Sequence, residues 1–244
     1  MHWSARAAAS AAELLPQLPP GDQERFVGWG VMGLPFRSGW CLALRCWAAT
    51  TIGPPYRAVY VRAPSGQWTI QTTAPPDQSC PRYLSSAAAE IPAPQRIDAQ
   101  WLDAETIHVG IAGELEWTIT LGDRPATRLM RAMAAVVPDR MWADNGFLAG
   151  MGAAAGLMLR AGRVRLRGLA PNGQWFQAVP SLVWPISDAQ ATWHGTELGR
   201  IGPLRPQTHL GDIWLPQRGL FYVGTATFDR LDPARHLRPV DTAA

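Results

Sequence analysis

Short apolar stretches that end at glycine- or proline-rich turns recur along most of the chain, and this pattern constrains its fold more than any other feature. Branched and aromatic side chains are frequent in these stretches, as is typical of β-strands. Two of the turns carry Ser65-Gly66 and Asn172-Gly173, pairs that favour tight connections between antiparallel strands. The pattern predicts a mainly β protein, built as an antiparallel β-barrel or a conical barrel.

Helical spacing occurs in two places. Residues 5–15 predict a short, alanine-rich N-terminal helix, and residues 124–161 predict a helical insert in the β-structure. We therefore expect an N-terminal helical arm over residues 1–25, a single β-barrel domain with this insert over 26–230, and a C-terminal tail over 231–244.

The run from Thr106 to Leu121 is the best-defined hairpin in the sequence. A three-residue turn at Ile111–Gly113 places its apolar side chains on one face, whereas a two-residue turn mixes apolar and acidic residues on both faces. The preferred register sets His108 opposite Glu116 on the polar face. The apolar face then carries Ile107, Val109, Leu115, Trp117 and Ile119.

His108 and Glu116 are the first candidates for catalysis. A carboxylate that accepts a hydrogen bond from an imidazole orients the ring and raises its basicity, as general acid–base catalysis requires. Glu114 shares their face and adds a second negative charge. If this face points outward, the two side chains make an ordinary cross-strand contact instead.

His209 and Asp212, just before the last β-rich segment, form a second candidate pair for acid–base chemistry. Convergence of distant segments at the barrel mouth would bring further polar and aromatic groups to a substrate. The expected substrate-binding residues are Trp117, Trp193, His194, Asp144 and Glu114.

All 22 basic residues are arginine, and the chain contains no lysine. Schiff-base chemistry, lysine-bound pyridoxal phosphate and the phosphate-loop lysine each need an ε-amine, so these classes are excluded. No HExxH, CxxC, GxSxG or GxGxxG motif is present, and we expect neither a metal nor another cofactor. The arginines form no basic stripe, so we expect no nucleic-acid partner.

The most apolar helical run, residues 145–159, is shorter than the roughly 20 residues that span a bilayer. The N-terminus lacks the continuous apolar stretch of a secretory signal. We therefore expect no membrane span and a cytoplasmic location. The glycine- and alanine-rich composition of the same run allows close helix packing, either within the protein or between the subunits of a homo-oligomer.

Two stretches resemble the acetoacetate decarboxylase-like fold: ETIHVGIAGELEWTITLG at residues 105–122 and THLGDIWLPQRGLFYVG at residues 208–224. They look like that family's central hairpin and closing strands. The resemblance implies a conical barrel with an internal pocket. The family's catalytic lysine and the lysine beside it are absent, so none of its catalytic residues carries over. A lipocalin-type barrel would give the same strand pattern and is an alternative.

Eleven of the twelve tryptophans lie on or beside expected elements, and polar groups are few there. This composition favours an apolar pocket with sparse polar contacts, as is usual for a small-molecule site. Our leading hypothesis is an enzyme without a cofactor that performs acid–base chemistry, such as isomerisation, ring opening, hydration or elimination, on a small hydrophobic molecule in the barrel pocket. The alternative is a non-catalytic carrier of a small apolar ligand.

Overall fold

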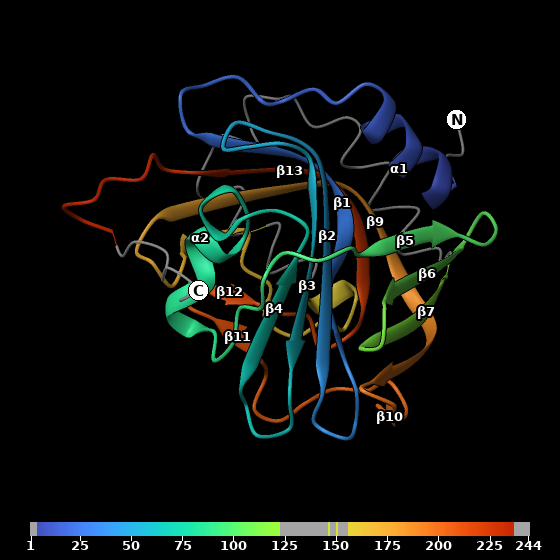
Figure 1. The fold of residues 1–244 in the computed structure, drawn as a ribbon. Coiled ribbons are helices and arrows are strands. Elements are labelled where there is room, and N and C mark those ends of the chain that lie inside the picture. Colours follow the sequence, from blue (N-terminus) through green and yellow to red (C-terminus); the bar gives the residue numbers. More distant parts are fainter. Residues whose placement is uncertain (1–3, 123–145, 147–149, 151–155, 237–244) are drawn as a thin grey trace.

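The computed structural model describes residues 4–122, 146, 150 and 156–236 (Figure 1). Most of the expected helical insert over residues 124–161 lies outside this part of the chain. The substrate-binding candidate Asp144 and the end of the C-terminal tail lie outside it too. The same holds for most of the run on which the homo-oligomer was predicted, so that oligomer stays a prediction.

One curled antiparallel sheet forms the body of the protein, in the strand order β4-β3-β2-β1-β13-β9-β7-β6-β5 (Figure 1). Among the described strands, β4 and β5 at the two ends do not pair with each other, so the sheet is a half-barrel. The mainly β, antiparallel, barrel-like fold is confirmed. The strands on this path are β1 Glu24–Pro35, β2 Cys41–Thr50, β3 Tyr56–Arg62, β4 Trp68–Thr72, β5 Asp98–Trp101, β6 Thr106–Ile111, β7 Leu115–Leu121, β9 Trp175–Trp193 and β13 Leu220–Phe228.

The 19-residue strand β9 joins the two parts of the sheet. Its first half pairs with β13 and its second half pairs with β7. Two short strands, β8 (Arg167–Leu169) and β10 (Thr196–Glu197), also pair with β9, and β11 (His209–Leu210) and β12 (Ile213–Trp214) form a separate hairpin. Because β9 belongs to both parts, the sheet can bend so that β5, β6 and β7 lie across one face of β1, β2 and β3.

The strands β1, β2 and β3 bury both of their faces. On β2, Leu42 and Leu44 point to one side while Cys41 and Ala43 point to the other, as the two-residue period of a strand requires. The first side packs against β6, β7 and the second half of β9. We call this packed interior the inner core; its large members include Trp29, Trp117, Trp184, Trp193, Phe36, Phe221, Ile107 and Ile119.

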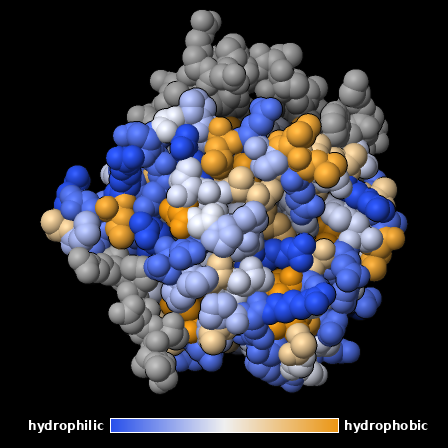
Figure 2. Space-filling view, turned by 45° about the horizontal axis from the view of Figure 1, so that its top comes forward, coloured by the Kyte–Doolittle hydropathy of each residue, from blue (hydrophilic) through white to orange (hydrophobic). Residues whose placement is uncertain are grey.

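The predicted N-terminal helix is present as α1, Ala5–Leu14. The Ser4 hydroxyl accepts a hydrogen bond from the Ala7 amide at 3.2 Å and caps its first turn. Ala5, Ala8 and Ala9 are buried against the inner core. The opposite side of the helix is exposed to solvent. On the side of the molecule that Figure 2 shows, hydrophobic residues lie in patches between hydrophilic ones.

The β6–β7 hairpin keeps the predicted faces but not the predicted register. The turn comprises Ala112–Glu114, one residue later than expected, with Gly113 at φ +74°. His108 therefore lies opposite Thr118 rather than Glu116. When the turn moves by one residue, each residue of β6 pairs with a residue of β7 that is two positions further along the chain. Because side chains alternate with a period of two, each one stays on its predicted face. The apolar face is buried in the inner core, as predicted.

Candidate functional site

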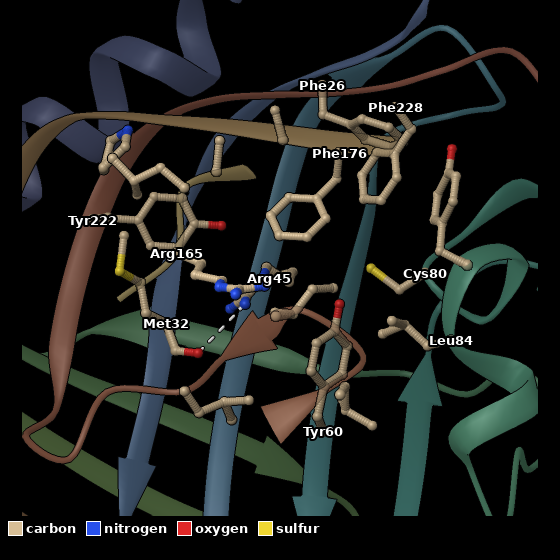
Figure 3. Close-up of a pocket in the computed structure, with 18 of the residues that line it drawn as sticks. Phe26, Met32, Arg45, Tyr60, Cys80, Leu84, Arg165, Phe176, Tyr222 and Phe228 are labelled. Atoms are coloured by element: carbon tan, nitrogen blue, oxygen red, sulfur yellow. Dashed lines mark hydrogen bonds between the residues drawn. The ribbon is translucent and has the colours of Figure 1, made fainter. Parts of the chain in front are cut away.

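A cavity of about 110 Å³ lies on the other face of β1, β2 and β3, away from the inner core (Figure 3). Strands β9 and β13 continue its wall, and the short helix α2 (Pro81–Leu84) with the β11–β12 hairpin covers it. We call α2 and this hairpin the cover. Aromatic rings make up much of the lining: Phe26, Trp47, Tyr56, Tyr60, Tyr83, Phe176, Trp214, Tyr222 and Phe228.

Glu24 holds the cover onto the sheet. Its carboxylate accepts hydrogen bonds from Arg82 Nη2 and the Tyr83 hydroxyl, each at 2.6 Å, and from Gln174 Nε2 at 3.1 Å. Burial alone raises the pKa of Glu24, but these donors outweigh it, so the pKa is lowered. One buried carboxylate thus links β1 to α2 and to the turn before β9.

Arg45 on β2 points into the cavity between the rings of Tyr60 and Tyr222 (Figure 3). Its guanidinium carbon lies 5.2 Å from the centre of the Tyr60 ring and 5.6 Å from that of Tyr222, within the range of cation–π attraction. Nη1 donates to the carbonyl oxygens of Val31 at 2.6 Å and Leu44 at 2.9 Å. These contacts fix the side chain against the cavity wall.

The charged side chains that line the cavity are all positive among the described residues. Among the described residues that line it, only Arg45 and Arg165 are charged, and no aspartate, glutamate or histidine joins them. Arg165 forms an ion pair with Asp212 on the cover. Within the described part of the chain, no carboxylate forms an ion pair with Arg45. Arg45 is half-buried, and backbone carbonyls and aromatic faces offset in part the loss of water around its charge.

The tyrosine hydroxyls of the cavity are neutral donors at neutral pH. Burial raises the pKa of Tyr222 to about 12, although the nearby Arg45 opposes the shift. The pKa values of Tyr56 and Tyr60 are raised well above 10, again mainly by burial. The Cys80 thiol also lines the cavity, with its sulfur 3.2 Å from the Tyr56 hydroxyl. The arrangement can therefore surround an apolar molecule and donate hydrogen bonds to it.

His108 and Glu116, the first predicted catalytic pair, do contact each other, but on the outer face of the half-barrel. His108 Nε2 lies 3.0 Å from Glu116 Oε2 in a diagonal cross-strand contact beside Gly110. Their side chains are 32% and 64% exposed, and neither lines the cavity. The geometry is that of the cross-strand contact considered as the alternative, and a catalytic role for the pair stays a prediction.

The four predicted substrate-binding residues that the structure describes all lie outside the cavity lining. Trp117 is fully buried in the inner core, and Trp193 is buried at its edge with the exposed His194 ring against it, 4.5 Å between centres. Glu114, in the β6–β7 turn, accepts hydrogen bonds from Gln71 Nε2 at 2.6 Å and Gln95 Nε2 at 3.0 Å.

The second predicted pair lies on the cover. The His209 ring stacks on Trp214, 4.6 Å between centres, and its Nδ1 is 3.0 Å from the Gly211 carbonyl oxygen. Asp212 accepts a hydrogen bond from the Leu169 amide at 3.1 Å, besides its ion pair with Arg165. Trp214 and Arg165 line the cavity, so this pair borders the site through its partners.

Sequence reasoning missed the residues that give the cavity its chemistry: Arg45, Tyr60, Tyr222 and Cys80. One signal was available, because Arg45 interrupts the otherwise apolar stretch CLALRCWAA. A charge in the middle of a strand buried on both faces needs a partner or a function.

Among the described helices, none combines the length and the apolar character needed to cross a bilayer. Nor do any three His, Cys, Asp or Glu side chains of the described residues gather closely enough to hold a metal ion. The predicted cytoplasmic location and the absence of a cofactor stay predictions.

The sequence matches no protein-family model and no curated protein. A search of solved structures matches it to acetoacetate decarboxylase from Legionella pneumophila, with a TM-score of 0.38 and 9% identity over 94% of this chain and 92% of that chain. This is a weak similarity at the level of the fold, and it says nothing about the chemistry of the present site.

Proposed function

We propose that this protein binds a small, mainly apolar organic molecule in the cavity beneath the cover. The observation that carries the proposal is the cavity itself: a cluster of aromatic rings with few polar groups, the usual composition of a ligand site. An apolar cavity of about 150 Å³ holds benzene. The volume of about 110 Å³ therefore suits a ligand of at most about that size.

The proposal concerns the binding of a ligand and does not extend to its turnover. The acid–base enzyme of our leading hypothesis needs a group that gains and loses a proton near neutral pH. The described lining offers tyrosine hydroxyls with raised pKa values, and no carboxylate or imidazole. An enzyme and a non-catalytic carrier would both need such a binding cavity, and turnover by any of these groups stays a prediction.

Addition of benzene tests the proposal, because a ligand that binds only the folded state raises the midpoint of thermal unfolding. Trp47 and Trp214 line the cavity, so their fluorescence should change at the same benzene concentrations. Ala178→Phe, which fills the cavity, should abolish both effects. Gln190→Phe, at an exposed position of the same strand, is the matched control and should retain them. No response in the wild type, or an equal response in both variants, would overturn the proposal.

A further inference from the structure

We infer that the ligand is a short-chain organic anion, and that Arg45 binds its carboxylate. This inference rests on the proposed binding function and adds the chemical class of the ligand. It starts from the unpaired charge of Arg45, which lines a cavity without any described acid.

The free donors of Arg45 have the geometry that a carboxylate needs. Of the five N–H groups of a guanidinium, the two on Nη1 donate to Val31 and Leu44, and one on Nη2 donates to Met32 at 3.4 Å. Among the described residues, Nε–H and the second Nη2–H have no hydrogen-bond acceptor. Nε–H and the neighbouring Nη2 form one edge of a guanidinium, and this edge can bind the two oxygens of a carboxylate.

The surroundings favour an anion over a neutral ligand. Arg165, the other cation of the lining, is already paired with Asp212, whereas Arg45 is balanced only by backbone carbonyls and aromatic rings. An apolar wall strengthens the attraction between the guanidinium and a carboxylate, because it screens charge less than water does. Neutral tyrosine hydroxyls beside Arg45 add donors and no negative charge.

The volume limits the rest of the ligand. A carboxylate that occupies part of about 110 Å³ leaves room for a short chain of a few carbon atoms, which the aromatic rings would surround. The inferred ligand is thus a short-chain monocarboxylate with its head on Arg45 and its tail toward rings such as Phe176.

Cys80 offers a direct test, because its thiol lines the same cavity. Iodoacetate and iodoacetamide have nearly the same size and react with thiols by the same displacement of iodide, but only iodoacetate is an anion. With glutathione as the reference thiol, we expect the ratio of the iodoacetate rate to the iodoacetamide rate at Cys80 to be at least roughly tenfold higher. Mass spectrometry of the labelled peptides gives both rates.

The chain contains its own controls. Cys41 and Cys46 lie outside the cavity lining, and burial raises the pKa of each thiol to about 12, so they should stay unlabelled in the folded protein. Arg45→Gln should lower the ratio at Cys80 to that of glutathione. Arg96→Gln removes an exposed, paired cation outside the cavity lining and should keep the preference.

Protection of Cys80 in the wild-type protein tests the inference without any variant. Butyrate should protect the thiol from iodoacetamide at concentrations roughly tenfold lower than its neutral analogue butyramide. Equal protection, or a glutathione-like ratio of rates, would overturn the anion inference while labelling by iodoacetamide still supports a ligand cavity. If neither reagent labels Cys80 in the folded protein and both label it after unfolding, the cavity is closed to such ligands and both proposals fail.

Discussion

The two faces of β1, β2 and β3 are both buried, yet one face packs into the inner core and the other borders the cavity. The inner core is closed by β6, β7 and β9, and β6 and β7 place a large apolar side chain at every second residue. The cavity is closed by one helical turn and a hairpin with two-residue strands. Regular elements can fill the space between them, whereas short irregular segments leave room for a ligand.

Truncation of matched leucines should separate the two faces most strongly. Leu44 is fully buried in the inner core, and Leu84 is 2% exposed but lines the cavity. We expect Leu44→Ala to lower the free energy of unfolding by about 4 kcal/mol and Leu84→Ala by about 2 kcal/mol, because a side chain beside a cavity has fewer contacts to lose. Urea denaturation measures both values. Equal losses would contradict the contrast between a solid face and a hollow one.

The link between the cover and the sheet should depend on Glu24. Its pKa is lowered in the folded state, so its stabilisation is present above the unfolded value of 4.5 and is lost as the pH falls below it. Glu24→Gln leaves Arg82 without its charged partner and should cost about 3 kcal/mol at pH 7. Unfolding measured between pH 7 and pH 3 should show a smaller fall in stability for the variant than for the wild type. If stability falls equally with pH in the variant and in the wild type, Glu24 is not the source of the pH dependence.

The ion pair between Asp212 and Arg165 should govern how readily the hairpin of the cover opens. Both side chains are about one-third exposed, so Asp212→Asn should cost only about 1 kcal/mol. A looser hairpin should let iodoacetamide reach Cys80 a few times faster. Asp98→Asn, which removes the exposed pair with Arg96, is the matched control and should leave the rate unchanged. An unchanged rate in both variants would show that access does not run past Asp212.

The smallest effects are expected on the outer face of the half-barrel. His108→Asn and Glu116→Gln should each change the free energy of unfolding by less than about 1 kcal/mol, because the pair is exposed to solvent. Labelling of Cys80 and the binding of benzene should not change. Any loss of ligand binding in either variant would connect this pair to the cavity and restore it as a functional candidate.

The alternation of apolar and polar residues along the sequence made the β6–β7 hairpin predictable, because one face of the hairpin is uniformly apolar. The turn was placed one residue too early, since both positions keep the same faces and differ only in local turn geometry. The alternation also identified Trp117 as a large apolar residue of this face, but it could not tell a residue of the inner core from one that lines a cavity.

The functional prediction chose the polar face of that hairpin because its histidine and carboxylate are easily recognised in a sequence. The cavity formed elsewhere, from β2, β3, β13 and the cover, which are far apart along the chain. Arg45 was visible as a charge in an apolar stretch, but a sequence does not show whether such an arginine meets a carboxylate. The neighbours of Arg45 include residues more than a hundred positions away along the chain, such as Tyr222, and only the folded structure brings them together.

The sequence by itself determined that this chain forms antiparallel strands, which side chains share a face, and that lysine chemistry is excluded. These properties follow from the two-residue period of a strand and from composition, both of which are local. Only the tertiary structure decided which buried face is filled and which is hollow, and that Arg45 faces the cavity without a described acid. Packing joins segments that are distant in sequence, and the space left between them depends on their shapes together.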